Sequence, residues 1–340
     1  MDFLIDFFNL NDVQWVPQIV NIIWNGSLYS LFALGYALIF SVLGVLNLAH
    51  SAIFMWGAYV GLWAVCGNTV FDGQCPAVDV PVWWAIPAAM IGGGIIAILV
   101  DRIAFYPLRQ RNAPRLSQLI SSIGIAIMMV AIAELVFGKE RLSMPLDAIP
   151  RRNFDIPDGL SIENPLDIGR IGLGMYVAEF NILLTPVRLQ IIVVSLILMI
   201  FLGFIVTQTR LGQGMRTVAF SERVSSLLGV HVDNIYMIAF FISGALAGAA
   251  GMLYTLNSNV FLPSTGSELT LKGLTVIVLG GLGSIRGAVL GGYLVAAIEV
   301  YMVAATDYGG LADAVVFFLF FLVLMFRPQG ILGQPLPDRA

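Results

Sequence analysis

The order of apolar and polar residues divides the chain into long, mostly uncharged runs separated by short polar or glycine-containing connections. Because a helix rises 1.5 Å per residue, about twenty apolar residues cross the roughly 30 Å of hydrocarbon in a bilayer. Most runs reach this length, which predicts helices that span a membrane. We place these spans at 17–43, 50–66, 82–106, 117–138, 188–208, 234–256, 273–283, 287–306 and 313–326.

The run at 273–283 is shorter than the others and contains Gly280, Gly281 and Gly283. Two structures fit it. A broken or re-entrant helix is tolerated at membrane depth only where protein or a water-filled cavity covers it, so it would indicate a translocation path. The alternative is a short, tilted helix that ends at a glycine. In either case the sequence predicts an all-α, polytopic membrane helix bundle of about eight or nine transmembrane segments, in one domain over residues 1–340.

Composition supports a membrane protein. Hydrophobic residues make up 59% of the chain and charged residues 11%, and the mean hydropathy is +0.90, whereas soluble domains are about 25% charged. The net charge is only -4 and the basic residues are scattered along the chain. We therefore expect a lipid bilayer around the protein and no nucleic-acid partner.

The basic residues indicate the orientation, because cytoplasmic loops carry an excess of Lys and Arg. If the first span is entered from outside, ten of the 17 basic residues lie inside or at inner helix ends. Six of the other seven belong to the connection 139–188 or its margins, and long loops cross largely regardless of charge; the seventh is Lys272, placed outside. We therefore expect an external loop at about 139–187, with hairpin character, and a cytoplasmic loop at about 209–233.

The chain contains no G-x-x-x-x-G-K-[ST] loop and no H-E-x-x-H motif. We therefore expect neither an ATPase site of its own, nor a metal, nor a cofactor. Cys66 and Cys75 bracket one short outer loop, at a spacing that suits neither a zinc site nor a redox pair. In an oxidising compartment they would form a disulfide that closes the loop; otherwise they are two unpaired small residues.

Polar groups inside the spans are the candidates for a path through the membrane. Glu134 and Glu299 are the acids that we place well inside spans, where an ionised carboxylate needs a partner or water. Of the two, Glu299 is the stronger candidate for a gating role, and contact with interfacial water is the alternative. The candidate path residues are Asn25, Ser27, Tyr36, Asn47, His50 and Glu299.

Glycine placement predicts close helix packing. Gly244 and Gly248 lie four residues apart in one span, as do Gly287 and Gly291 in another, so each pair leaves one helix face without side chains. These faces are packing seams, or alternatively seams that slide during gating. The candidate hinge or packing positions are Gly244, Gly248, Gly280, Gly281, Gly283, Gly287 and Gly291.

Four blocks of sequence carry a more specific signal. They are Gly26-Ser-Leu-Tyr-Ser-Leu-Phe-Ala-Leu-Gly-Tyr36, continued by Gly44 to His50 and Trp56 to Tyr59; Gly214 to Glu222 with Leu228-Gly229-Val230; Gly280 to Gly291; and Phe326-Arg-Pro-Gln-Gly-Ile-Leu-Gly333. In this order they resemble the permeases of branched-chain amino acid ABC importers. The resemblance covers residues from about 20 to 333, except the loop 139–187, which is longer than in the simplest members.

The resemblance implies a multi-pass permease subunit in a bacterial inner membrane. Its partners would be a second permease, usually a paralogue and occasionally a copy of the same chain, together with two cytoplasmic ATPase subunits and a periplasmic solute-binding protein. Its substrates would be amino acids, branched-chain or otherwise neutral, with amides and urea in some branches of the family. The same resemblance assigns Ala219, Glu222 and Gly229 to a coupling helix that contacts the ATPase.

Reasoning from the residues separately supports a surface helix at 214–229. Glu222 stands early in a short helix-capable stretch, where the positive helix end favours a carboxylate. Gly229 closes that stretch where a positive φ is usually required. Two other classes of protein remain as alternatives, an ion-coupled secondary transporter and a solute channel of the urea or ammonium kind, and neither needs a coupling loop.

Overall fold

The computed structural model describes residues 15–72, 84–111, 113–139, 142–143, 175–177, 182–184, 186–258, 260–306, 309–327 and 329–333. The elements are α2 (Trp15–Leu43), α3 (His50–Cys66), η1 (Gly67–Asp72), α4 (Ala85–Val100), η3 (Asp101–Phe105), α5 (Tyr106–Gln110), α6 (Arg115–Phe137), β1 (Leu142–Ser143), β2 (Met175–Val177), β3 (Ile182–Leu184), α7 (Pro186–Gln208), α8 (Arg210–Phe220), α9 (Glu222–Leu227), α10 (Val232–Ser258), β4 (Val260–Phe261), α11 (Thr265–Gly280), α12 (Ile285–Thr306) and α13 (Gly309–Phe326).

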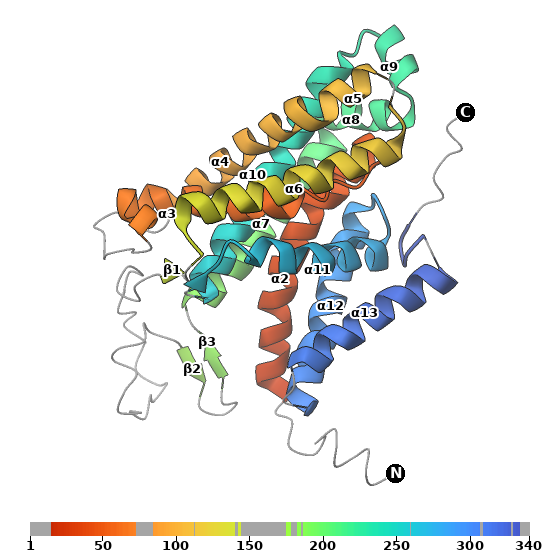
Figure 1. The fold of residues 1–340 in the computed structure, drawn as a ribbon. Helices are drawn as coiled ribbons and strands as arrows, with labels where there is room; N and C mark the ends of the chain where they lie inside the picture. Colours follow the sequence, from red (N-terminus) through yellow and green to blue (C-terminus); the bar gives the residue numbers. More distant parts are fainter. Residues whose placement is uncertain are drawn as a thin grey trace.

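Long apolar helices make up most of the described chain and form a bundle (Figure 1). Seven helical stretches among these residues are long and apolar enough to cross a membrane, and α11 and α13 contain two shorter apolar stretches. These nine stretches lie where the hydrophobic pattern places the nine spans, which confirms the predicted polytopic helix bundle.

The bundle is built around α2. Residues 26–43 of this helix are almost all buried, as is most of α10, whereas α6 and α7 expose most of their surface. Figure 1 shows α4, α6 and α10 on one side of α2, and α12 and α13 on the other. The contact between α2 and α12 is close, because Gly292 faces the backbone of Ser30 and the Ser30 hydroxyl donates to the Val289 carbonyl at 2.9 Å.

The predicted span at 273–283 corresponds to the second half of α11, which is one unbroken helix. Its 16 residues rise about 24 Å, and it ends where Gly281 takes a φ of 115° and donates its N–H to the Ile277 carbonyl. The structure therefore has a short helix with a glycine end at this position, and the helix is not broken. α11 begins at Thr265, so Lys272 lies inside this helix and its assignment to an external connection was wrong.

The chain after the last span completes the end of α11. The amides of Ile331 and Leu332 donate to the carbonyls of Leu279 and Gly280, each at 2.9 Å. These carbonyls belong to the last turn of the helix, where no amide further along the same helix is available to them. A segment about 50 residues later in the sequence therefore satisfies backbone groups that α11 leaves unpaired.

Short strands lie at the end of the bundle opposite α8 and α9 (Figure 1). β2 and β3 pair antiparallel, which agrees with the hairpin predicted in the connection 139–187, and β1 pairs antiparallel with β4. The rest of that connection lies outside the described residues. Cys66, at the same end of α3 as η1, is disulfide-bonded; Cys75, the chain's other cysteine, is also outside the described residues.

Candidate functional site

The predicted coupling segment forms two short helices, α8 and α9, each begun by a side-chain cap. The hydroxyl of Thr209 accepts the Gly212 N–H at 3.2 Å, and that of Ser221 accepts the Val224 N–H at 3.3 Å. Because capping oxygens satisfy amides that a helix start leaves unpaired, the chain can break and restart between the two helices. Ala219 lies in the last turn of α8, and Glu222 is the first residue of α9.

Gly229 ends this segment in a left-handed conformation. Its φ is 80°, a value that a residue with a Cβ rarely adopts, while the space around its Cα is open. The need for glycine at this position is therefore conformational and not steric. The Gly229 N–H donates to the Ser226 carbonyl at 3.1 Å, so the glycine closes the turn that follows α9.

The surface around α9 carries large apolar side chains in an otherwise polar segment. Their exposed fractions are 66% for Phe220, 47% for Val224, 82% for Leu227 and 69% for Leu228. Figure 1 shows α9 at one end of the bundle, beyond most of the length of the spans. Since exposed apolar clusters outside the lipid-facing surface usually mark contact sites, we call these four residues the α9 apolar patch.

A cleft of about 900 Å³ lies beside this patch, between α5, α9 and the start of α10. Charged and polar groups line much of it, including Arg109, Glu222, Arg223, His231, Asp233 and Tyr236. The patch and the cleft together give this end of the molecule both apolar and charged features.

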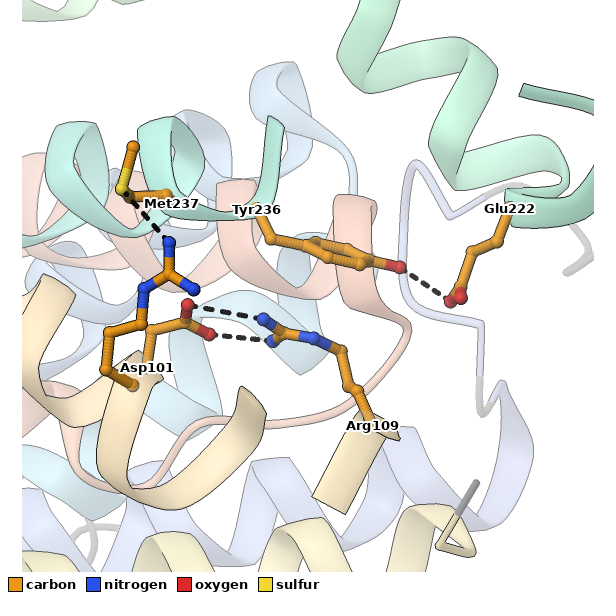
Figure 2. A network of polar contacts seen from close by, with 6 residues as sticks. Asp101, Arg109, Glu222, Tyr236 and Met237 are labelled. Carbon is orange, nitrogen blue, oxygen red and sulfur yellow. Dashed lines mark hydrogen bonds and ion pairs between the residues drawn. The ribbon is translucent and has the colours of Figure 1, made fainter. Parts of the chain in front are cut away.

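A chain of polar contacts joins α9 to the third span (Figure 2). The Arg109 guanidinium holds both carboxylate oxygens of Asp101, at 2.7 and 3.2 Å, and its Cζ lies 4.4 Å from the centre of the Tyr236 ring. The Tyr236 hydroxyl donates to Glu222 Oε1 at 2.6 Å. Sequence reasoning identified Glu222 but missed the other three. Asp101 lies near the end of the predicted span 82–106, and the sequence predicts only Glu134 and Glu299 as acids well inside spans.

Glu299, a candidate path residue, is held by partners from two other helices, α11 and α2. Its two oxygens accept from Lys272 Nζ at 2.8 Å and from the Tyr29 hydroxyl at 2.7 Å, and Lys272 also lies 2.9 Å from Asp313. The pairing partners Lys272 and Asp313 were not anticipated as a site. Glu134, the other acid that the sequence places well inside a span, lies 3.5 Å from the exposed Lys139 just after α6.

The candidates on the first half of α2 lie near this cluster. Ser27 is buried and its hydroxyl is 2.9 Å from that of Tyr293 on α12, and Asn25 is half-buried one turn before Tyr29. Three hydroxyls therefore lie along the contact between α2 and α12, those of Ser27, Tyr29 and Tyr293.

A second group, Tyr36, Asn47 and His50, lies at the start of α3. His50 is fully buried, with Nε2 3.2 Å from the Phe32 carbonyl, Nδ1 3.2 Å from the Ser243 hydroxyl and its ring 4.4 Å from that of Tyr36. Asn47 accepts the Ala49 N–H at 3.1 Å through its side chain. The contacts of His50 therefore join α2, α3 and α10, whereas the Asn47 bond is local to the start of α3.

The predicted glycine faces lie where helices touch. Gly244 and Gly248 approach the backbone of α4 at Gly93 and Ala89, so an added Cβ would collide with main-chain carbonyls. In the same way, Gly287 faces the Gly280 carbonyl and Gly291 faces the Val276 carbonyl across the contact between α12 and α11. Gly281 and Gly283 have positive φ angles and form the turn between these two helices.

Comparison with known proteins identifies the architecture. Residues 18–324 match the model of the family described as branched-chain amino acid transport system, permease component. The chain belongs to this family. It is therefore a multi-pass membrane protein and a permease component of a transport system, which makes the predicted family correct. The family match begins within α2 and ends within α13, and it includes the segment with Ala219, Glu222 and Gly229.

Curated relatives cover nearly the whole chain. It is 31% identical to the high-affinity branched-chain amino acid transport system permease protein BraD of Pseudomonas aeruginosa, over 95% of this chain and 97% of that protein. It is 30% identical to the corresponding protein LivH of Escherichia coli K12, with the same coverage. A probable branched-chain amino acid transport permease protein LivH of Methanocaldococcus jannaschii is 25% identical over 90% of this chain and 89% of that one. No solved structure matches the chain significantly.

Proposed function

We propose that this chain is the permease subunit of an ATP-driven ABC importer for branched-chain or other neutral amino acids. It forms the translocation path together with a second permease, a paralogue. Two cytoplasmic ATPase subunits drive transport, and a periplasmic binding protein delivers the solute. Support comes from the family match and from relatives whose names specify branched-chain amino acid transport. The proposed location is a bacterial inner membrane.

The observation that carries the ATP-driven mechanism is the geometry of α8 and α9. A short capped helix that presents the α9 apolar patch outside the spans suits a contact with a soluble ATPase subunit. In our proposal Ala219, Glu222 and Gly229 shape this contact. ATP-driven closure of the ATPase pair then moves α9, and the spans alternate between outward-open and inward-open arrangements.

The proposed path uses the polar groups of α2 and its neighbours. A zwitterion needs hydrogen-bonding groups and little uncompensated charge along its route. Asn25, Ser27 and Glu299 fit this requirement, since Glu299 already has cationic and hydroxyl partners. Tyr36, Asn47 and His50 flank the route at the start of α3 in this proposal, and the glycine faces of α10, α11 and α12 act as hinge or packing positions.

We propose an orientation with the first span entered from outside, the loop 139–187 external and the loop 209–233 cytoplasmic, in one domain over residues 1–340. The excess of basic residues at the α9 end supports it. The disulfide at Cys66 also supports it, because disulfides persist in oxidising compartments and Cys66 is at the opposite end from α9.

The test is to purify the chain from its native membrane, identify the chains that co-purify, and reconstitute the complex in vesicles. We expect a second permease and an ATPase, and uptake of labelled leucine, isoleucine and valine that requires both ATP and the solute-binding protein. Preference for urea or an amide would replace the amino-acid assignment. Transport by this chain alone, driven by an ion gradient or by no energy source, would replace the importer with a secondary transporter or a channel.

A further inference from the structure

The third span contains a change in helix type close to the α9 end. Between α4 and α5, residues Asp101–Phe105 form a π-helical turn, in which the Tyr106 N–H donates to the Asp101 carbonyl five residues earlier. Such turns widen a helix, are rare, and are frequent at functional sites. This turn also places a carboxylate inside the protein, since only 1% of the Asp101 side chain is exposed.

A buried carboxylate needs a compensating charge, and Arg109 supplies it. The guanidinium binds both Asp101 oxygens, a geometry that fixes its plane as well as its position. With 12% of its side chain exposed, Arg109 is held on the same helix, beyond the π turn. The ion pair therefore links the π turn to α5, at the end of the span.

Arg109 also contacts α10, and α10 in turn contacts α9. Its guanidinium lies over the ring of Tyr236, a buried residue near the start of α10, and the hydroxyl of that ring binds Glu222. Figure 2 shows the side chains in the order Asp101, Arg109, Tyr236 and Glu222, each next to the one before it. Of the residues in α9, only Ser225 is buried, so packing alone holds this helix weakly.

We infer that Asp101 and Arg109 are positioning residues that hold α9 to the third span through Tyr236, so that a displacement of α9 moves the π turn with it. This inference rests on the proposed ABC function, in which α9 receives the movement of the ATPase. It adds the route by which that movement enters the membrane. The route consists of the hydrogen bond between Glu222 and Tyr236, the contact of the Arg109 guanidinium with the Tyr236 ring, and the ion pair between Arg109 and Asp101.

A distance measurement tests the mechanical part. Spin labels at Gln110→Cys and Ser226→Cys, both exposed positions on α5 and α9, report the separation of the two segments in the assembled complex. We expect the same narrow distance distribution without nucleotide and with ATP trapped. With Tyr236→Phe added, we expect the distribution to broaden or shift when ATP is trapped. Separation of the labels in the unmodified complex, or no effect of Tyr236→Phe, would overturn the inference.

A coupling measurement tests the functional part. Tyr236→Phe removes only the hydroxyl that binds Glu222 and leaves the ring under Arg109, so the buried ion pair keeps its environment. We expect solute imported per ATP hydrolysed to fall about tenfold, the change that corresponds to a lost hydrogen bond to a charged group, at unchanged complex yield. Arg109→Lys, which keeps the charge but cannot bind both oxygens, should produce the same fall.

The matched control is Tyr106→Phe, on α5. This change also removes one tyrosine hydroxyl at the same end of the molecule, and it leaves the ring under Arg102, 4.8 Å from its centre. We expect normal coupling in this variant. If the unmodified complex shows no ATP-driven uptake, the proposed function fails. If it does, and Tyr236→Phe couples as well as Tyr106→Phe, only the positioning role fails.

Discussion

Lys272 on α11 and Glu299 on α12 form an ion pair inside the helix bundle, with Nζ and Oε1 2.8 Å apart. The ammonium also pairs with Asp313 on α13, and the second Glu299 oxygen accepts from Tyr29 on α2. Four helices therefore meet at two charged side chains. Each charge compensates the other where water is scarce, so neither can be removed alone without cost.

Lys272→Ala should destabilise the fold. Loss of one partner of a fully buried pair costs about 3–5 kcal/mol, and we reduce this to about 1–3 kcal/mol because both side chains are about one-fifth exposed. The measurement is thermal unfolding of the purified chain in detergent. Lys139→Ala is the control, because Lys139 is 81% exposed and lies 3.5 Å from Glu134; an equal loss in both variants would contradict a special role for the Lys272 pair.

Gly248→Ala should weaken the contact between α10 and α4. A Cβ at Gly248 would collide with the backbone carbonyl of Ala89, which cannot rotate away as a side chain can. We expect a loss of about 1–3 kcal/mol in unfolding free energy, the usual cost of forcing extra volume into a packed contact.

The control for this change is Gly203→Ala in α7, where an added Cβ meets nothing within 4 Å. This substitution should be neutral or stabilise by about 0.5–1 kcal/mol, since glycine is the poorer helix former. The same detergent unfolding assay compares the two. If Gly248→Ala were as well tolerated as Gly203→Ala, the close approach of α10 and α4 would be wrong.

Gly229→Val should uncouple ATP hydrolysis from uptake in the reconstituted complex. A β-branched residue is strained at a φ of 80°, so the turn after α9 would change shape. Gly229→Asn is the matched control, because asparagine tolerates this conformation and adds a side chain in the same open space. We expect near-normal uptake per ATP with Asn and a clear fall with Val.

Glu222→Arg tests the same segment by charge. It replaces the acceptor of the Tyr236 hydroxyl with a cation close to Arg109 and at the positive start of α9, where a carboxylate is favoured. We expect uncoupling at normal membrane insertion, measured as solute-stimulated hydrolysis and uptake at equal complex content. Normal coupling in both this variant and Gly229→Val would leave α8 and α9 as an ordinary connection.

The orientation predicts which positions a membrane-impermeant thiol reagent reaches in intact cells. A cysteine introduced at Gly159, in the loop 139–187, should be labelled from outside. Cysteines introduced at Arg111 or Gly214 should be labelled only after the membrane is opened. The reverse pattern, with Arg111 and Gly214 labelled in intact cells and Gly159 protected, would invert the topology.

The spans were predictable because bilayer thickness sets helix length, and because an apolar, uncharged run of about twenty residues is typical of a transmembrane helix. α2 and α3 illustrate this, since both follow their predicted ranges closely. The turn at Gly229 was also predictable, because its φ follows from the local sequence of a short helix and a terminal glycine. In both cases the information lies within a few neighbouring residues.

The start of α11 was not predictable in the same way. Thr270 and Lys272 give the segment before residue 273 a polar sequence typical of a loop, yet both lie in the helix. Thr270 donates to the Ser51 hydroxyl, 219 residues away, and Lys272 pairs with Glu299 and Asp313. Such compensation between distant segments is absent from the local pattern, and the same holds for Asp101 and Arg109 with Tyr236 on α10.

The two hydrogen bonds from Ile331 and Leu332 to the end of α11 also bear on biosynthesis. α11 and α12 are made before these amides, so the carbonyls of Leu279 and Gly280 lack their native partners while α12 and α13 are inserted. That turn reaches its native form only after the residues that follow α13 have been made. Pairing of Ile331 and Leu332 with the end of α11 is thus a late step in assembly. A stop codon just after the final span would release a permease that has all of its helices but lacks the two bonds that complete α11.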